Sequence, residues 1–369
     1  MSRAESPRPS PESRIPNPKV RAMPAPDLVT GGSGYFGSLL VRQLRAHGRA
    51  VRIFDLNDAD DRPAEVEFFQ GDIRDAAAVR RACDGCAAVY HNVAMVPLAK
   101  DKSAFWSVNE GGTRVLLEAC RETGVKKVVY TSSSAVYGAP PKNPVDDDTP
   151  LNPGEEYGRA KLAGEELCRQ FSAAGLDVSI IRPRTIMGHG RLGIMQILFE
   201  WIRRGMNIPV LGKGDNLYQF VHADDLADAC VRAAARPGPA AYNIGAASFG
   251  TMRETLDGLI AHAKTGSRVV SLPMAPAVAL MKLTSALGLS PLGAYHSLMY
   301  GRSMYFDISR AQRELGWTPR YDNVEMFRQS YDWYLANREA ILAARGMSHH
   351  RSPVDQGALK IVGWILRLR

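Results

Sequence analysis

Short apolar runs alternate with stretches of helical periodicity from residue 27 to about residue 181, and this alternation limits the possible folds more than any other feature. The expected strands are residues 28–30, 51–54, 66–69, 87–91, 127–131 and 178–181. The expected helices are residues 35–46, 76–83, 106–123 and 155–173. Regular alternation of strands and helices gives a doubly wound parallel sheet, so we predict an α/β fold of this class.

Three glycines spaced three residues apart, Gly31, Gly34 and Gly37, separate the first expected strand from the first expected helix. The amino terminus of a helix offers unpaired N–H groups and a positive dipole end, which attract phosphate. Asp55 ends the second expected strand, where its carboxylate is suited to bind both hydroxyls of an adenosine ribose. The pattern predicts a Rossmann-type NAD site. It leaves NADP open as an alternative, although the carboxylate would repel a 2′-phosphate.

The composition changes on either side of the predicted NAD(P)-binding domain, which we place at residues 27–182. Residues 1–26 contain seven prolines and almost no apolar run, which is typical of a disordered extension. Residues 183–340 interrupt the alternation and are expected to form a smaller C-terminal substrate lobe, interleaved with the core, over the carboxyl edge of the sheet. Residues 341–357 are interpreted as a linker, and residues 358–369 as a tail helix.

The tail, residues 358–369, has the composition of a short basic amphipathic helix. Lys360 and Arg367 lie one heptad apart among apolar residues, and Trp364 is suited to a membrane interface. Such a helix can lie on an anionic membrane surface but is too short to cross a bilayer. We therefore expect peripheral contact with the inner face of the cytoplasmic membrane. The alternative is that the tail packs on the domain or on a second copy.

The overall composition argues against several classes of protein. Five cysteines in 369 residues do not make a disulfide framework, which indicates a reducing, cytoplasmic setting. Cys83 and Cys86 form a single C-x-x-C with no second pair, so we predict no metal site. The net charge of +8 is modest, and no basic stripe alternates with aromatic residues in the body of the chain. We therefore expect no nucleic-acid partner.

A second group of residues suits acid–base chemistry. Tyr157 and Lys161 lie four residues apart, so they share one face of the expected helix. A neighbouring ammonium group favours tyrosinate, so we expect Lys161 to lower the pKa of Tyr157 toward the working pH. A tyrosine tuned in this way exchanges a proton with a carbonyl or alcohol oxygen. Ser133, at the end of the fifth expected strand, can hydrogen-bond to the same oxygen.

Taken together, these motifs resemble the extended short-chain dehydrogenase/reductase superfamily, in particular its NAD-dependent epimerase/dehydratase group. The resemblance covers roughly residues 27–335. It rests on T-G-G-S-G-Y-F-G (30–37), G-D-I-R-D (71–75), H-N-V-A (91–94), V-N-E-G-G-T (108–113), Y-G-R-A-K (157–161), I-R-P (181–183), F-V-H-A-D-D-L-A (220–227), Y-N-I-G (242–245) and L-G-W-T-P (315–319). It implies a homodimeric NAD(P)-dependent oxidoreductase that acts on a CH–OH group of a small-molecule or lipid substrate.

The resemblance also implies roles for individual residues. Ser133, Tyr157 and Lys161 would be the catalytic residues, with Asn109 supporting them. The residues implied in cofactor binding are Gly31, Ser33, Gly34, Tyr35, Phe36 and Gly37 in the glycine turn, Asp55 at the ribose, Asp72 and Ile73 at the adenine, Asn92, Val93 and Ala94 along the cofactor, and Asn109, Tyr157, Lys161 and Pro183.

Members of this group share hydride transfer and differ in the step that follows it, which can be elimination, decarboxylation, return of the hydride or release of the product. Dehydratases and decarboxylases of this group carry acidic residues directly after the catalytic serine, where this chain has Ser134 and Ala135. Elimination and decarboxylation are therefore disfavoured. A reductase and an epimerase remain, and the implied catalytic residues serve both equally well. A non-catalytic NAD-binding regulator is disfavoured because all three of those residues are present.

The substrate lobe favours a lipid over a nucleotide sugar. Related sugar-nucleotide epimerases commonly carry an arginine just before the F-I-H-V-D-D stretch, where it pairs with the diphosphate, but this chain has Tyr218 and Gln219 there. Residues 272–300 are rich in leucine and methionine and suit a long flexible chain, unless they form an ordinary helix on the core. We expect reduction of a keto group, or oxidation of the matching alcohol, on a 3-oxo-ceramide, sphingoid or sterol-like lipid. The alternative is a nucleotide-sugar 4-epimerase or keto-sugar reductase.

Overall fold

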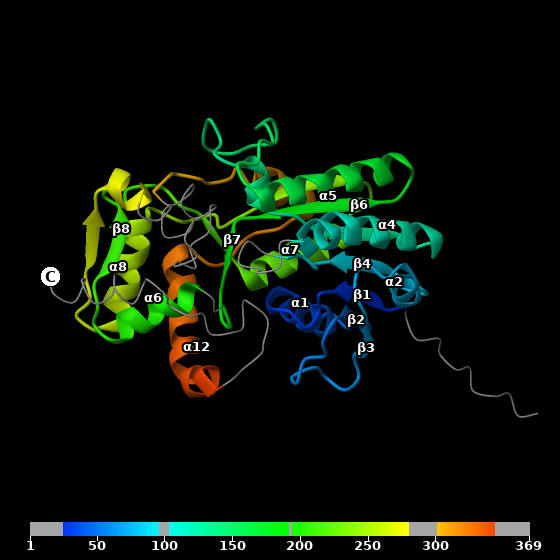
Figure 1. The fold of residues 1–369 in the computed structure, drawn as a ribbon, viewed down its shortest axis with the longest axis horizontal. Coiled ribbons are helices and arrows are strands. Elements are labelled where there is room, and N and C mark those ends of the chain that lie inside the picture. Colours follow the sequence, from blue (N-terminus) through cyan, green and yellow to red (C-terminus); the bar gives the residue numbers. More distant parts are fainter. Residues whose placement is uncertain (1–24, 96–102, 192–193, 280–300, 344–369) are drawn as a thin grey trace, which may run out of the picture.

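The computed structural model describes residues 25–95, 103–191, 194–279 and 301–343. Its centre is a seven-stranded parallel sheet with the strand order β10-β6-β5-β4-β1-β2-β3 (Figure 1). The strands are β1 (Asp27–Thr30), β2 (Val51–Asp55), β3 (Glu67–Gln70), β4 (Ala88–His91), β5 (Lys127–Thr131), β6 (Val178–Pro183) and β10 (Ala240–Ile244). The predicted doubly wound fold is confirmed, and every predicted strand overlaps an observed one.

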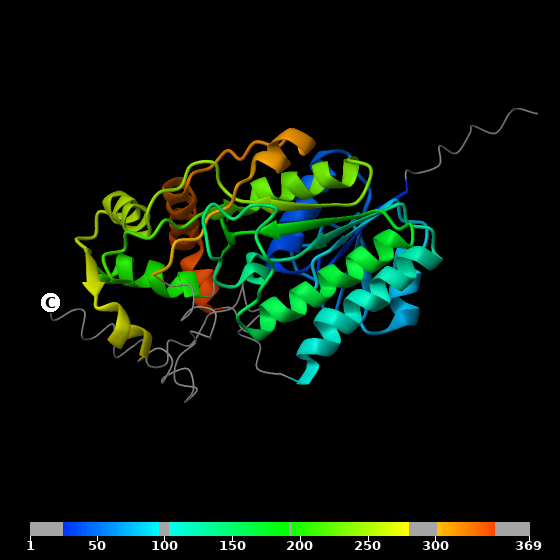
Figure 2. The same cartoon turned by 90° about the horizontal axis from the view of Figure 1, so that it is seen from above.

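Helices cover both faces of the sheet and enclose two apolar cores (Figures 1 and 2). One face carries α1 (Tyr35–Ala46) and α7 (Ala223–Ala235), and the other carries α2 (Ala76–Cys83), α4 (Gly112–Glu122) and α5 (Glu156–Ala173). The strands β1, β4 and β6 are covered on both faces and buried along their length, which explains their almost continuous apolar runs, whereas the edge strand β3 has no buried residue. Where one helix was predicted at 106–123, the observed helical segment begins earlier and is irregular. It consists of α3 (Ser103–Trp106), a π-helical turn (Ser107–Gly111) and then α4.

The chain leaves the main sheet after β6 and builds a smaller lobe beside the carboxyl ends of the strands (Figure 2). The lobe contains α6 (Ile194–Arg203), α8 (Met252–Ala263) and α12 (Asn323–Ala343), the strand pair β7 (Thr185–Met187) and β9 (Phe220–His222), and the strand pair β8 (Ile208–Leu211) and β11 (Val269–Leu272). Between these elements the chain returns to the core to add α7 and β10, against which α11 (Ser309–Leu315) packs. Lobe and core are therefore interleaved.

Several predicted segments lie outside the described residues: most of the extension at 1–26, the tail at 358–369, and the part of the apolar stretch at 280–300. The predicted linker at 341–357 overlaps the end of α12, which continues to Ala343. Among the described helices, none combines the length and the apolar character that crossing a bilayer requires.

Candidate active site

The glycine turn joins β1 to α1. Gly31 has a φ of +70°, a conformation that favours glycine. A Cβ on Gly37 would overlap the Gly31 carbonyl group, so the close approach of helix and turn also requires glycine there. Gly34 caps α1 without a side-chain hydrogen bond, and the side chains of Tyr35 and Phe36 are buried. The turn thus presents a helix amino terminus built from backbone groups, which is the arrangement that binds phosphate.

Asp55 ends β2 beside this turn. Its carboxylate accepts hydrogen bonds from the backbone N–H groups of Ser33, at 3.0 Å, and of Leu56, at 2.7 Å. Burial raises the pKa of the Asp55 carboxyl group, and these hydrogen bonds oppose the rise. The predicted ribose ligand therefore lies next to the predicted phosphate site, and it also fixes the shape of the turn.

The two residues expected at the adenine differ in their surroundings. Asp72 is partly exposed and accepts a hydrogen bond from Nε of Arg74 at 2.9 Å, which lowers the pKa of its carboxyl group. Ile73 is buried in the core, and a Cβ on Gly112 would collide with it. Only the side chain of Asp72 is open to a ligand, whereas Ile73 can contribute its backbone.

Strand β4 leads into the segment expected along the cofactor. The His91 ring is held between the hydroxyl groups of Thr30, at 2.8 Å, and Thr113, at 3.1 Å, and burial lowers its pKa to about 3. Asn92 accepts a hydrogen bond from Thr131 at 2.6 Å, while its buried side-chain nitrogen has no partner among the described residues. His91 is thus a satisfied core residue, and Asn92 keeps a donor unused.

Asn109 lies in the π-helical turn and is buried. Its side-chain oxygen accepts a hydrogen bond from the Met95 backbone N–H at 2.8 Å, and its side-chain nitrogen donates to the Met95 carbonyl at 3.1 Å. Both polar atoms of this side chain therefore hold the chain just after the half-buried residues Val93 and Ala94. Asn109 therefore positions the segment that follows β4.

Ser133, Tyr157 and Lys161, the predicted catalytic trio, meet where β5 and α5 come together. The Ser133 side chain lies within hydrogen-bonding reach of the Tyr157 hydroxyl. Lys161 is 3% exposed, donates from Nζ to the Thr131 carbonyl at 2.8 Å and lies 5.0 Å from the centre of the Tyr130 ring. The backbone carbonyl and the ring face stabilise the ammonium group in this buried position.

The expected effect of Lys161 on Tyr157 is not observed. Burial raises the pKa of Tyr157 to about 12, and the nearby Ser133 and Arg191 oppose this only in part. Burial also lowers the pKa of Lys161 to about 8. The prediction of a lowered tyrosine pKa is wrong because it counted the ammonium charge and neglected the lost hydration of both groups.

A buried polar network beneath the trio was not predicted. Glu165, one turn after Lys161, accepts two hydrogen bonds from Arg182, from Nε at 2.9 Å and from Nη2 at 2.7 Å. Ser132 donates to Glu165 at 2.7 Å, and Arg182 donates to Tyr137 at 2.8 Å. The four-residue spacing from Lys161 to Glu165 was the available signal, since both side chains lie on one face of α5.

Two further arginines follow β6, which ends at Pro183. Arg184 lies with its guanidinium carbon 4.7 Å from the centre of the Tyr218 ring. The guanidinium of Arg191 lies 5.5 Å from the centre of the Tyr35 ring, and its charge acts on Tyr157. Arg191 thus stands between the glycine turn and the trio, a position that no local motif in the sequence indicated.

His222 orders its own loop. Its Nδ1 accepts a hydrogen bond from the Asp224 backbone N–H at 3.1 Å and so caps α7. Side-chain ligand atoms of His189, His222 and Asp224 lie within 4.8 Å of one another. The capping bond occupies Nδ1 of His222, while its buried Nε2 has no partner among the described residues.

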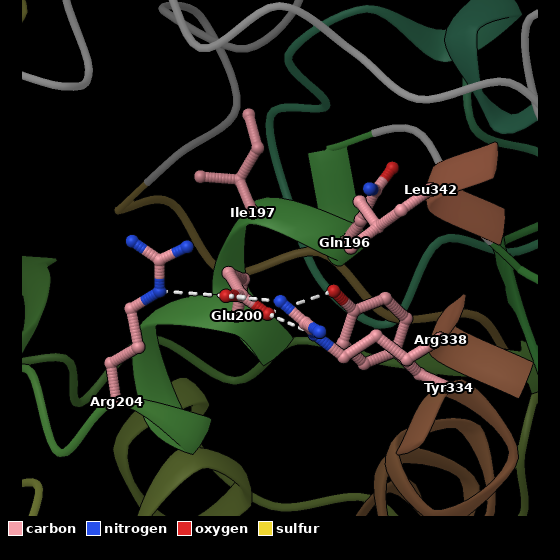
Figure 3. Close-up of a pocket in the computed structure, with 7 residues that line it drawn as sticks. All are labelled: Gln196, Ile197, Glu200, Arg204, Tyr334, Arg338 and Leu342. Atoms are coloured by element: carbon pink, nitrogen blue, oxygen red, sulfur yellow. Dashed lines mark hydrogen bonds and ion pairs between the residues drawn. The ribbon is translucent and has the colours of Figure 1, made fainter. Parts of the chain in front are cut away.

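A separate surface pocket lies between α6 and α12, and none of the predicted site residues lines it (Figure 3). Glu200 accepts hydrogen bonds there from Arg204 at 2.6 Å, Arg338 at 3.0 Å and Tyr334 at 3.0 Å. Burial would raise the pKa of Glu200, but these donors outweigh it and lower the pKa. The cluster ties two helices of the lobe together.

Comparison with known proteins agrees with this geometry. Residues 28–245 match the model of the NAD dependent epimerase/dehydratase family. An uncharacterised protein, y4nG, from Sinorhizobium fredii is 58% identical over 92% of this chain and 86% of its own length. UDP-glucose 4-epimerase from Mycolicibacterium smegmatis is 30% identical over 83% of this chain and 97% of its own length.

Two more similarities bear on the substrate. The decarboxylating sterol-4-alpha-carboxylate 3-dehydrogenase of Mus musculus is 32% identical over 56% of this chain and 58% of its own length. The structure of MoeE5 in complex with UDP-glucuronic acid and NAD superposes with a TM-score of 0.70 at 27% identity, covering 85% of this chain and 99% of MoeE5. The relatives therefore include proteins named for sterol and for nucleotide-sugar substrates.

Proposed function

This chain belongs to the NAD-dependent epimerase/dehydratase family, and we propose that it transfers hydride between NAD and the carbon of a secondary alcohol or ketone. The observation that carries the proposal is the meeting of Ser133, Tyr157 and Lys161 on a sheet whose first turn is shaped to bind a dinucleotide. A protein that only binds NAD has no need of this combination.

NAD is the cofactor of the family, and the residues around the glycine turn fit it. The turn depends on the missing Cβ of Gly37, and Asp55 offers a carboxylate at the end of β2, the position that suits ribose hydroxyls. The unused side-chain nitrogen of Asn92 adds a donor at the end of β4. When bound, NAD accepts or supplies the hydride, while the protein orients the reactants and manages the proton.

Tyr157 is the group that handles the proton. Its hydroxyl donates to a carbonyl oxygen during reduction and, as tyrosinate, accepts from an alcohol during oxidation. Ser133, within reach of that hydroxyl, can hold the same substrate oxygen. Lys161, whose pKa burial lowers to about 8, remains mostly charged at neutral pH.

For the substrate we propose a lipid-like molecule with a 3-oxo or 3-hydroxyl group of the sterol type. The similarity to a sterol-4-alpha-carboxylate 3-dehydrogenase supports this class. Tyr218 and Gln219, which stand where related epimerases carry an arginine, are both buried. Gln219 donates to the Ala246 carbonyl at 2.6 Å and accepts from the Phe306 N–H at 2.9 Å, so it serves packing. The sphingoid and ceramide substrates and the membrane contact stay predictions from the sequence.

A nucleotide-sugar 4-epimerase is the second candidate. The similarity to UDP-glucose 4-epimerase spans 83% of this chain, against 56% for the sterol dehydrogenase. An epimerase returns the hydride to the same sugar and forms no net NADH, whereas a dehydrogenase forms one NADH for each alcohol oxidised. The stoichiometry of NADH therefore distinguishes the two reactions.

A spectrophotometric assay with product analysis tests the assignment. We expect the enzyme with NAD and a 3β-hydroxysteroid to form one NADH per ketone produced, and we expect no UDP-galactose from UDP-glucose. Interconversion of the two UDP-hexoses without NADH would favour the epimerase. Binding of NAD with no turnover of any secondary alcohol or ketone would reject the enzyme assignment.

A further inference from the structure

We propose that Arg184, together with Ser134, binds an anionic group of the substrate, a carboxylate or a phosphate, beside Ser133. This inference rests on the proposed function, because it assigns the substrate side of the same site. It adds an anionic group to the proposed substrate, so that a steroid carrying a carboxylate, or a nucleotide sugar, should bind more tightly than a neutral lipid of the same size.

Arg184 is 1% exposed, and within the described residues the recorded contacts of its guanidinium are all with neutral groups. Nη1 donates to the Ser134 hydroxyl at 3.0 Å and lies 3.2 Å from the sulfur of Met304. Nε and Nη2 are buried and have no partner within the described part of the chain. A buried guanidinium without a counter-charge is strongly unfavourable, which indicates that a ligand supplies one.

Arg182, two residues earlier, illustrates what the free edge of Arg184 can bind. Nε and Nη2 of Arg182 lie along one edge of its guanidinium and donate to Glu165 at 2.9 and 2.7 Å. Arg49 uses the same two atoms to bind Asp27, both at 2.8 Å. In Arg184 this same edge is the part without a partner. Because the edge matches two oxygens of a carboxylate or phosphate, its ligand has that chemistry.

The position of Arg184 connects this edge to the reacting groups. Ser134, which accepts its hydrogen bond, directly follows Ser133, whose side chain lies within reach of the Tyr157 hydroxyl. The ring of Tyr218 lies 4.7 Å from the guanidinium carbon. Tyr218 stands where related sugar-nucleotide epimerases commonly carry an arginine, so in this chain a cation reaches the same neighbourhood from the end of β6.

The test uses pairs of ligands that differ by one anionic group, titrated calorimetrically at constant ionic strength into the NADH-saturated enzyme, which cannot oxidise the steroid alcohol. One pair is uridine and UDP, and the other is a 3β-hydroxysteroid and the same steroid with a carboxylate beside the hydroxyl. We expect the anionic member of one pair to bind about tenfold more tightly than its neutral partner. Arg184→Met should abolish this preference without changing the Kd of the neutral ligand.

Two further variants sharpen the result. Arg184→Lys should lower the preference by about threefold, because an ammonium group cannot bind two oxygens along one edge, and it is informative even where Arg184→Met folds poorly. Arg114→Met, an exposed arginine of α4, is the control for the loss of one charge. A preference for UDP would assign a phosphate, and a preference for the steroid carboxylate would assign a carboxylate.

Equal binding within both pairs would overturn the proposal, as would an unchanged preference in both Arg184 variants. Because the readout is binding, the anion site can fail while Tyr157→Phe still abolishes turnover. Loss of the proposed enzyme activity and loss of the anion site are therefore distinguishable outcomes.

Discussion

Two groups of buried polar side chains around the trio differ in how completely they are paired. Beneath the trio, Glu165 and Arg182 bind each other through two hydrogen bonds. Beside the trio, one edge of Arg184, Nε of Arg191 and the side-chain nitrogen of Asn92 are buried without partners in the described ranges. Native proteins keep few such groups, and each calls for an explanation such as a bound ligand. Substitutions in the paired region should therefore change the stability of the fold, whereas substitutions in the unpaired region should change ligand binding.

The largest expected effect concerns turnover. Tyr157→Phe removes only the hydroxyl that exchanges the proton, so kcat should fall by roughly a thousandfold, while the Kd for NAD and the melting temperature stay unchanged. Steady-state kinetics and calorimetry measure these quantities. Turnover that survives in this variant would remove Tyr157 from the mechanism.

The paired region is tested by Glu165→Gln. The variant leaves the charge of Arg182 buried without a counter-ion, so the free energy of unfolding should fall by about 3 kcal/mol in urea denaturation. Glu166→Gln, an exposed neighbour on α5, is the matched control and should change stability by less than about 0.5 kcal/mol. Equal effects of the two substitutions would mean that the network contributes nothing to stability.

The pH dependence of stability tests His91, a second fully paired group. Burial holds its folded-state pKa at about 3, below the ordinary value of 6.5. As the pH falls through 6.5 only the unfolded chain takes up the proton, so this contribution is present above pH 6.5 and is lost toward pH 3. Between pH 6.5 and 5 the free energy of unfolding should fall by roughly 1.5 kcal/mol through His91.

Denaturation of wild type and His91→Asn at both pH values isolates this contribution, because asparagine does not titrate. The exposed His47→Asn should retain the wild-type slope. An equally steep loss of stability in His91→Asn would assign the pH dependence to other groups.

The smallest expected effect concerns the cofactor. Asp55→Asn keeps the shape of the side chain but accepts fewer hydrogen bonds, so the Kd for NAD should rise about tenfold and the discrimination against NADP should weaken. Fluorescence titration measures both constants. Asp58→Asn, an exposed carboxylate in the next turn, should bind NAD as the wild type does. Unchanged affinity in Asp55→Asn would place the ribose elsewhere.

The cofactor side of the site could be predicted because its signals are local. The three glycines act within one turn, and Tyr157 and Lys161 are brought together by a single helix. The bounds of α1 and α2 also depend on local sequence signals, and their predicted ranges agree with the structure. Periodicity and turn chemistry are sufficient for features of this kind.

The remaining features depend on contacts between distant parts of the chain. Arg184 meets Tyr218, and Arg191 meets Tyr35, only after the lobe has packed on the core. The raised pKa of Tyr157 likewise comes from its burial. Sequence spacing carries no information on how far a side chain loses its hydration, so the direction of that shift required the fold.

The chain returns to the main sheet after building part of the lobe, and this limits how the protein can be divided. α7 packs on α1, and β10 pairs with β6, although both elements come from beyond residue 220. A fragment ending at residue 182 would leave β6 as an unpaired edge strand that can pair with another chain, and it would expose the apolar side of α1. The dinucleotide-binding half is consequently not an autonomous folding unit, and we expect both halves to melt together as one cooperative block.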